Sequence, residues 1–480
     1  MQMIQALLIL AFAAPIAGLA SALALGQRRS KGVGIASTAV SLIASVLIIS
    51  SFLSTGKSVA EGITYIPQLN IGFSLYAYPI SVVLLLMSSI VFFAAAIGGN
   101  VKGLKYKGSV SLLLLFQVAA TGLFLSGNLL MYFIFWDIGV IAAYFMISTL
   151  GSGGRRRSGM KFLVYSFAAS VLLLLGIIML YYYSPTVSGL HSFSIPYLIA
   201  NASSIPEGIQ TAIFALLFIA FMIKMPVFPL HSWMADAYAD APTEGSMLVS
   251  GVLSKFGAYG MLLLFLMLPV AKNYSEYVFA LAAISTFYAI FVAMRQTDLK
   301  KVLAYTSMAE MGIILAGIAS LNQIGIYGAV FGMLAHGVTI ALAFLVIGSI
   351  EMMFGERNFT MLKGIARSTQ ASSYMFIIAI LGITGMPLTA GFIADLLIFI
   401  GAYGAFGIYG LIPLAAIILM GAYLYFFVEK SFFSHGSSPP HEFNIGVSQK
   451  LSYAILAGSI FIIGSLPFLI LNAINFLKVL

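Results

Sequence analysis

Ionisable side chains lie within long apolar stretches of this 480-residue sequence, where a charge is costly and usually marks a functional site. They are two lysines, three acids and one histidine: Asp137, Lys224, Lys255, Glu310, His336 and Asp395. A buried lysine whose carboxylate partner comes and goes can take up and release a proton near neutral pH. Together, these residue types predict a proton relay inside a membrane.

Structural roles compete with the relay for several of these residues. Lys224 and Asp137 can form an ion pair that only fixes helix packing, and Asp395 can be a protonated acid that hydrogen-bonds to a neighbouring helix. Lys255 has no acid nearby in the sequence, and it lies among small residues in GVLSKFGAYG that leave room for water. For these four residues we favour the relay.

The other ionisable residues are harder to assign. A neutral histidine bonded to a carbonyl is common, although we favour a relay role for His336. Glu310 is equally compatible with a structural and a functional role. Glu351 lies near the end of its apolar stretch, and we expect it to be solvated.

The elements that must position these residues are transmembrane helices. The chain is 61% hydrophobic and only 8% charged, whereas about a quarter of the residues in soluble domains are charged. Apolar runs long enough to cross the bilayer recur throughout, which predicts an all-α polytopic membrane protein of about 14 helices. We expect these spans near 3–26, 32–53, 76–98, 108–126, 128–149, 159–183, 209–229, 243–268, 275–294, 301–320, 325–353, 373–398, 404–428 and 450–475.

The net charge of +9 is mainly a topology signal. Most of the 23 Lys and Arg residues fall in loops that follow odd-numbered spans, as Arg28 and Arg155 do. Only Lys57, Lys272 and Lys478 fall on the other side. The positive-inside rule therefore predicts a multi-pass protein of the cell membrane with both termini outside. Nucleic acid is not an expected partner.

Two spans, the seventh and the twelfth, carry a Met-Pro pair near their middle, in FMIKMPVFPLHSW (221–233) and TGMPLTAGF (384–392). Proline interrupts helical hydrogen bonding, and a broken helix at membrane depth must face protein or a water-filled cavity. Paired breaks indicate internal repeats of the transporter kind. The alternative is that Pro and Gly are simply common in membrane helices.

The paired breaks predict two inverted five-helix repeats, spans 4–8 and 9–13, each with one half-channel. The predicted organisation is 1–107 for the first three spans, 108–268 for the first repeat, 269–428 for the second and 429–480 for the last span. The longest loops, near 54–75 and 184–208, are too short for a soluble domain. The chain has no cysteine and no metal-ligand spacing, so we expect no cofactor and no metal, and redox chemistry must belong to partners.

Four stretches of the sequence resemble signatures of one family. They are KMPVFPLHSWMADAYADAPTEGSMLVSGVLSKFGAYG (224–260), RQTDLKKVLAYTSMAEMG (295–312), LAHGVTIALAFLVIGSI (334–350) and GMPLTAGFIADLLIF (385–399). They resemble the antiporter-like subunits of respiratory complex I, of Mrp-type cation/proton antiporters and of membrane-bound hydrogenases. The resemblance covers roughly spans 4 to 13, and that family has the same architecture of 14 helices with inverted repeats.

The resemblance implies a role for each matching residue. Asp137 matches the acid of span 5, which is usually Glu after Trp in the family. Lys224 matches the lysine of span 7, and Lys255 the central lysine of span 8. His336 matches the histidine of span 11, and Asp395 matches the exit residue of span 12.

The sequence also departs from the family pattern. Glu244 stands where many members have Pro, Ser250 where a His is frequent, and Thr339 where some members have Lys. Glu310 stands where His is common. We therefore expect water or Glu310 to bridge part of the usual path. These departures favour the hydrogenase and Mrp branches over respiratory complex I itself.

The predicted function is that of an ion-pumping, antiporter-like subunit that moves protons, or sodium in exchange for protons. Its expected partners are other membrane subunits, including related antiporter-like ones, and lipid. Energy would come from a redox-driven complex, such as a complex I-like dehydrogenase, membrane-bound hydrogenase or related reductase, or the chain would serve an Mrp-type complex. The alternatives are a non-conducting scaffold subunit and a stand-alone secondary transporter for an organic solute.

Overall fold

The computed structural model describes residues 2–25, 27–55, 58–66, 71–99, 107–186, 189–434 and 445–475. The described chain is almost entirely helical. Four basic residues that bear on the predicted orientation lie outside the described residues: Lys57, Lys102, Lys105 and Lys478.

The N-terminal part contains three long helices and a β-hairpin. The helices are α1 (Gln2–Ala24), α2 (Gln27–Thr55) and α3 (Pro79–Gly98). Between α2 and α3, the antiparallel strands β1 (Val59–Ile66) and β2 (Ile71–Ala77) replace the loop predicted near 54–75. This segment is rich in β-branched and aromatic residues, and pairing satisfies its backbone groups.

The first predicted repeat region begins with four long helices. They are α4 (Lys107–Phe124), α5 (Leu129–Phe145) with its π-helical extension η3 (Met146–Leu150), α6 (Arg155–Tyr183) and α8 (Glu207–Lys224). Short helices α7 (Ile195–Asn201) and η4 (Ala202–Ser204) connect α6 to α8. After the break come α9 (Met234–Asp240) and one continuous helical stretch, formed by α10 (Thr243–Leu248), η5 (Val249–Leu253) and α11 (Ser254–Met267).

The second predicted repeat region follows through η6 (Pro269–Tyr274). Its helices are α12 (Ser275–Ala293), α13 (Leu299–Ala319), α14 (Gln323–Phe354), α15 (Ile365–Ser368), α16 (Gln370–Ile383), α17 (Ala390–Phe406), η7 (Gly407–Leu411), α18 (Ile412–Val428) and η8 (Glu429–Phe433). The chain ends in α19 (Val447–Ser465) and α20 (Phe468–Ile474).

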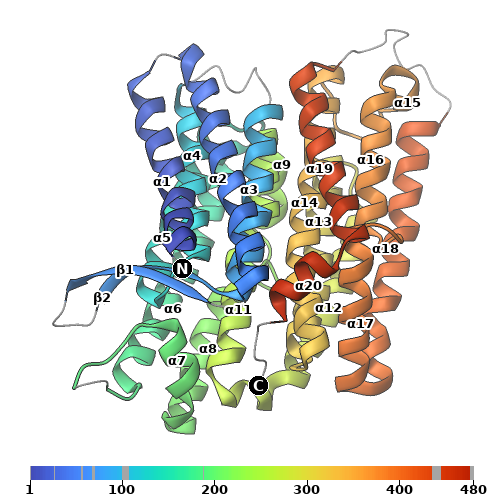
Figure 1. Cartoon of the computed structure of the whole chain (residues 1–480). Helices are drawn as coiled ribbons and strands as arrows, with labels where there is room; N and C mark the ends of the chain where they lie inside the picture. The colour runs from blue at the N-terminus through green and yellow to red at the C-terminus, as the bar shows by residue number, and fades with distance from the viewer. Residues whose placement is uncertain are drawn as a thin grey trace.

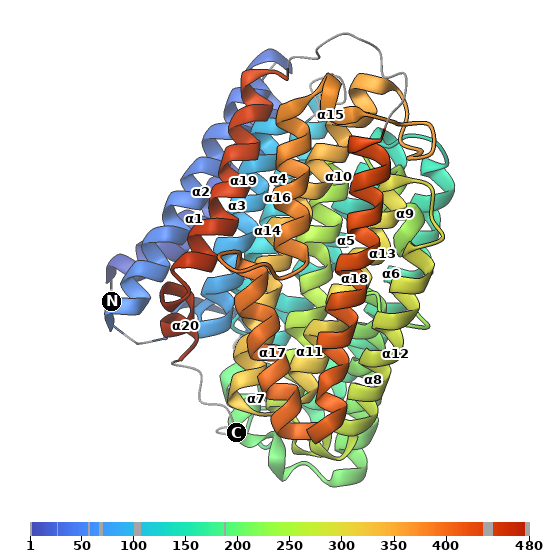
Figure 2. The same cartoon turned by 90° about the vertical axis from the view of Figure 1, so that its right-hand side faces the viewer.

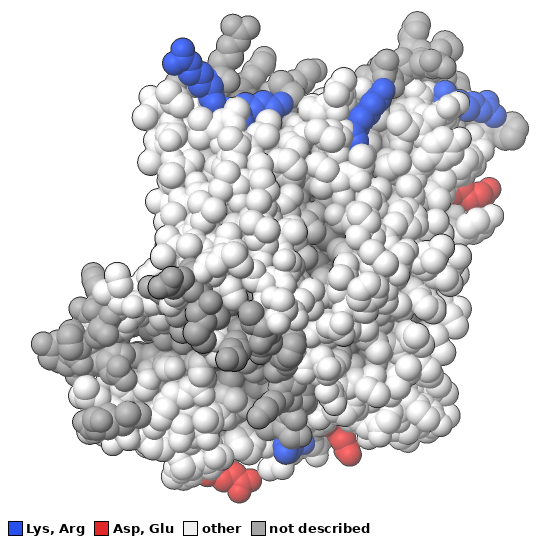
Figure 3. Space-filling view, in the orientation of Figure 1, with Lys and Arg blue, Asp and Glu red and all other residues white. Residues whose placement is uncertain are grey.

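The arrangement is that of a polytopic membrane protein. Twelve helical stretches of the described chain are long and apolar enough to cross a membrane, and two shorter apolar helices accompany them. The long helices lie side by side with their axes roughly aligned (Figures 1 and 2). Described Lys and Arg side chains gather at the upper end of the face in Figure 3, and its broad middle is largely uncharged. The all-α class is therefore confirmed, while the count of 14 spans and the inverted repeat stay predictions.

The two helix breaks share one backbone hydrogen-bond pattern. In the first break, the N–H groups of Met225, Val227 and Leu230 donate to carbonyls four, five and three residues earlier. The same three spacings recur a constant 159 residues later, at Thr384, Met386 and Thr389. The breaks thus have the same local geometry, which is consistent with the predicted repeat.

This backbone register differs from the one that the Met-Pro pairs indicate. The hydrogen-bond pattern aligns Pro226 with Gly385. The second Met-Pro pair therefore lies two residues further along its break than the first pair does. Gly385 has a φ of +62°, which the proline ring cannot adopt. In the shared register, the proline of the second break, Pro387, therefore stands two positions later than Pro226 does in the first break.

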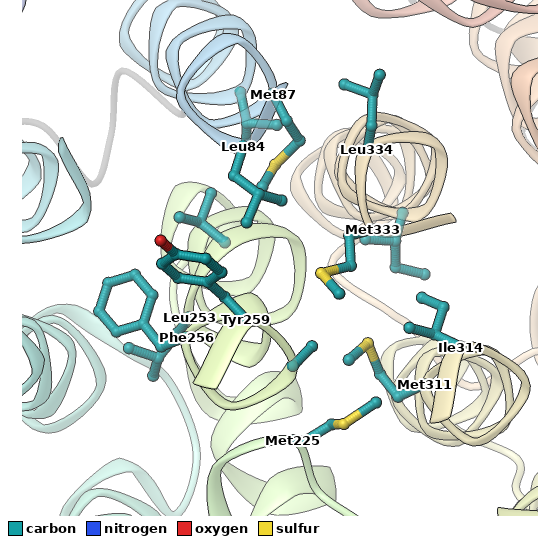
Figure 4. Packing of buried hydrophobic residues seen from close by; sticks show 14 of the residues in the cluster. Leu84, Met87, Met225, Leu253, Phe256, Tyr259, Met311, Ile314, Met333 and Leu334 are labelled. Atoms are coloured by element: carbon teal, nitrogen blue, oxygen red, sulfur yellow. The ribbon is translucent and has the colours of Figure 1, made fainter. Parts of the chain in front are cut away.

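The centre of the molecule is formed by a few completely buried helices. In the most apolar stretches of α14 and of Thr243–Met267, 100% of the residues are buried, compared with 28% of the residues in that of α1. α14 packs against α3, α13, α16, α17 and α19. Figure 4 shows the packed side chains in this region, among them Met87, Phe256, Met311 and Met333. Because Lys255 and His336 belong to these central helices, they lie at the core of the protein.

Candidate ion-translocation site

Lys224 is the last residue of α8, directly before the first break. It is completely buried, and its Nζ donates a hydrogen bond of 3.3 Å to Ser166 Oγ on α6. The ammonium also lies 4.7 Å from the centroid of the Trp136 ring, a favourable cation–π distance. A cation at the C-terminal end of a helix is stabilised by the helix dipole. The break thus places Lys224 where a buried positive charge is best tolerated.

Asp137 does not pair directly with Lys224. The ion pairs found among the described residues do not join these two side chains. Instead, Asp137 Oδ1 accepts a hydrogen bond of 2.5 Å from Ser170 Oγ, one turn of α6 after Ser166. The structural alternative of a direct ion pair is therefore not seen, and α6 supplies the link. Sequence reasoning missed both serines, for which the available signal was their four-residue spacing on one face of an apolar span.

Lys255 is completely buried near the start of α11. Its Nζ donates to the Ser250 carbonyl at 3.2 Å and to Ser254 Oγ at 3.3 Å, and it is in direct contact with Nδ1 of His336. Ser250 belongs to the π-helical turn η5, a deviation that is frequent at functional sites. The lysine that lacked an acid nearby in the sequence thus has a histidine from α14 as its partner.

His336 connects Lys255 to two groups on α13. Its Nε2 lies 3.0 Å from Ser307 Oγ and 3.5 Å from Glu310 Oε2. When Lys255 is charged it can only donate, so in that state Nδ1 of a neutral His336 accepts and Nε2 carries the proton. That proton then points toward Ser307 and Glu310, which gives the imidazole the orientation of a proton shuttle.

Glu310 and Asp395 line one small cavity together with His336. The space in this cavity that the centre of a water molecule can occupy is about 10 Å³, which is roughly the room that one water molecule needs. Glu310 Oε2 has no hydrogen-bond partner within the described chain. Asp395 Oδ2 packs against the second break, because a Cβ added to Gly385 would lie only 2.4 Å from it. The break therefore places Asp395 at the cavity, as the first break places Lys224.

The six predicted residues thus form two groups, one around Lys224 and one around Lys255. The helices that carry these lysines meet at Gly257, where an added Cβ would lie 2.7 Å from the Met225 nitrogen and 2.8 Å from the Phe221 carbonyl oxygen. Glycine at this position lets the end of α8 lie directly against α11. Among the described residues no hydrogen bond or ion pair joins the two groups, which meet through the close packing of α8 against α11.

A charge network near the helix ends joins the two predicted repeats. Arg357 Nε lies 2.7 Å from Asp298, and its terminal nitrogens lie 3.6 Å from Asp240 and from Glu351. Glu351 also pairs at 2.7 Å with Lys300, whose side chain is only 2% exposed. Glu351 keeps 27% of its side chain exposed, as the expectation of a solvated residue requires, but it also has ion-pair partners from segments distant in sequence.

Buried lysines, acids and a histidine beside two helix breaks are the residue types expected in an ion-translocating membrane protein. A family model described as NADH:quinone oxidoreductase/Mrp antiporter, transmembrane region, matches residues 126–420. The chain belongs to this family.

The relatives are subunits of oxidoreductase complexes. The chain is 32% identical to NADH-quinone oxidoreductase subunit M of Rickettsia felis, over 82% of this chain and 79% of the relative. It is 30% identical to F(420)H(2) dehydrogenase subunit M of Methanosarcina mazei, over 78% and 76%.

Solved structures with the same fold belong to three kinds of complex, each with a TM-score of 0.88. They are respiratory complex I from Thermus thermophilus (23% identity, 98% of both chains), the archaeal membrane-bound sulfane sulfur reductase (25%, 98% of this chain and 77% of the other) and the Mrp complex from Dietzia (20%, 100% and 98%). The sequence identities of 23% and 20% to the complex I and Mrp chains are low, so these two likenesses support the fold alone. With the family match, the chain is an antiporter-like, ion-translocating subunit.

Proposed function

We propose that this antiporter-like subunit moves protons through the two groups of ionisable residues and works within a multisubunit membrane complex. The observation that carries the proposal is the continuous contact from Lys255 through His336 to Glu310 and the cavity shared with Asp395. A structural ion pair would need only two of these groups. Four proton carriers in sequence, each within reach of the next or of one water molecule, are what proton transfer requires.

The route begins at Asp137, whose charge modulates Lys224. Lys224 then passes a proton to Lys255, a step that requires water or a movement of the helices at the junction of α8 and α11, where no described side chain bridges the two lysines. Lys255 protonates His336 at Nδ1, and the imidazole releases its Nε2 proton to Glu310, so the ring carries charge without moving. Glu310 then passes the proton through the cavity to Asp395, which serves the second half-channel.

The energy for this transport comes from partner subunits. The relatives are named as subunits of NADH-quinone oxidoreductase and F(420)H(2) dehydrogenase, and one structural neighbour belongs to a sulfane sulfur reductase. A redox-driven complex of this type in the cell membrane is therefore the proposed setting, with related antiporter-like subunits as neighbours. The basic helix ends would face the cytoplasm and both termini the outside.

The test is Lys255→Ala in the assembled complex, reconstituted into liposomes. Proton pumping should fall by about 100-fold, the contribution of a positioned proton carrier, while Lys272→Ala, at an exposed site, should pump normally. Pumping at the wild-type rate by the Lys255 variant would refute the relay and favour a scaffold role. Ion movement in liposomes by the purified chain alone, coupled to uptake of an organic solute, would instead favour a stand-alone secondary transporter.

A further inference from the structure

Two serines of α6 lie between Asp137 and Lys224, and nothing in the relay described above uses them. We propose that Ser170 is a positioning residue of the relay, which holds the Asp137 carboxylate and links it through α6 to Lys224. This inference rests on the proposed function, because it assigns a residue that the same proton path needs.

Ser170 is the meeting point of three groups. Its Oγ donates to Asp137 Oδ1 at 2.5 Å and accepts from Trp136 Nε1 at 3.1 Å. The Ser166 carbonyl also lies within reach, at 3.0 Å. Both serines are buried, with exposed fractions of 5% for Ser170 and 1% for Ser166. No other hydroxyl of the described chain is bonded to Asp137, so the position of this carboxylate depends on Ser170.

The hydroxyl of Ser170 has a single proton and two acceptors. When Asp137 is ionised, the proton goes to the carboxylate, because a charge-assisted hydrogen bond is the stronger one. When Asp137 is protonated, the acid can donate to Ser170 Oγ, and the hydroxyl turns to the Ser166 carbonyl. The side-chain hydroxyl of the same residue, Ser166 Oγ, accepts a hydrogen bond from Lys224 Nζ at 3.3 Å. A change of charge on Asp137 therefore alters the hydrogen bonding of the Ser166 backbone, one turn earlier on α6, in the residue whose hydroxyl holds Lys224.

Trp136 explains why the link runs through α6. Its ring lies beside Lys224, with 4.7 Å between Nζ and the ring centroid, and its indole N–H is fixed by Ser170. One hydroxyl therefore orients both the aromatic ring and the carboxylate that face the lysine. Removal of this hydroxyl would release both at once.

The plain alternative is that the hydroxyl of Ser170 only donates a hydrogen bond to a backbone carbonyl of its own helix. Serines in membrane helices commonly bond to the carbonyl four residues earlier, and Ser170 is within reach of the Ser166 carbonyl. If that were its whole role, Ser170→Ala would leave transport unchanged. The 2.5 Å contact with Asp137 and the bond from Trp136 are what set Ser170 apart from such a serine.

The experiment compares serine variants in the complete complex, with assembly and electron transfer measured beside proton pumping. Ser170→Ala should assemble normally and lose about tenfold in pumping, the loss expected for one charge-assisted hydrogen bond. Ser89→Ala is the matched control, because Ser89 is 1% exposed and its hydroxyl has no hydrogen-bond partner within the described chain. It should pump like the wild type.

Two rescues separate positioning from packing. Ser170→Thr keeps the hydroxyl and should keep most of the activity. The double variant Ser170→Ala with Asp137→Glu should regain pumping, since the added methylene brings the carboxylate nearer to Lys224.

Each outcome of these comparisons decides one claim. If Asp137→Ala pumps normally, the proposed role of Asp137 in the relay fails, and the inference about Ser170 fails with it. If Asp137→Ala is inactive but Ser170→Ala pumps normally, only the inference fails. If Ser170→Ala is slow and neither rescue restores pumping, Ser170 has a packing role and the inference is overturned.

Discussion

Replacement of Glu310 by glutamine should interrupt the second half of the relay with little change in packing. The amide has the shape of the carboxyl group but cannot take up and release a proton. Glu310 Oε2 lies 3.5 Å from His336 Nε2 and has no other polar partner within the described chain. The substitution therefore removes one proton acceptor and breaks no structural hydrogen bond.

The size of the effect follows from the absence of a bypass among the residues that the structure describes. The other neighbour of His336 Nε2 is Ser307 Oγ, which accepts from Ser250 Oγ, and the carbonyl of Ser250 accepts from Lys255 Nζ. This circle of hydrogen bonds does not reach Asp395. The cavity beyond Glu310 has room for roughly one water molecule, so no chain of waters replaces the carboxylate. We therefore expect a loss of about 100-fold, the lower range for a positioned proton carrier.

The assay is dye-monitored acidification in liposomes that contain the complete complex, with electron transfer recorded separately. Glu310→Gln should keep assembly intact and lose proton pumping, and Glu276→Gln, at an exposed position on α12, is the control. Pumping by Glu310→Gln within about twofold of the wild type, well inside the predicted loss, would refute the assignment of Glu310 as the bridge. The proton would then have to leave His336 by another route.

Two further predictions concern the packing that brings the two groups together. Gly257→Ala should cost about 1–3 kcal/mol of stability through overpacking against the end of α8, and should slow pumping. Thermal unfolding and the pumping assay check this, with Gly458→Ala as control because a Cβ there meets no atom within 4 Å. A Gly257 variant as stable and active as the control would contradict the close junction. Arg357→Met should destabilise the complex by about 1–3 kcal/mol because it leaves Asp298 without its ion-pair partner, whereas Arg156→Met, at an exposed position, should not. Equal unfolding temperatures for these two variants would show that the network contributes nothing.

The sequence was sufficient to predict the parts that hydrophobicity marks strongly. Apolar runs predicted the helices, and Lys224 and Lys255 were conspicuous because charges are rare at such depth. Serine carries no comparable signal, since it is common in membrane helices, where its hydroxyl bonds to a backbone carbonyl of the same helix. The link through Ser166 and Ser170 therefore became visible only when α6 was placed beside α5 and α8.

Other features depended on partners that are distant along the chain. The pairing of Glu351 with Lys300 and Arg357 joins segments that no local pattern connects. The register of the two breaks was hidden by the Met-Pro pairs, which are a better match in sequence than in backbone geometry. Whether the six candidate residues form a working relay stays a prediction for the experiments above.

The narrowness of the cavity between Glu310 and Asp395 has a consequence for selectivity. A proton crosses such a gap by hopping through one ordered water, with no net movement of a heavy atom. Because the cavity has room for roughly one water molecule, a sodium ion on this route would have to shed nearly all of its hydration shell, or wait until α17 moved away from α14. If ions take the proposed route, the gap in this conformation would pass a hopping proton and hold back a hydrated ion.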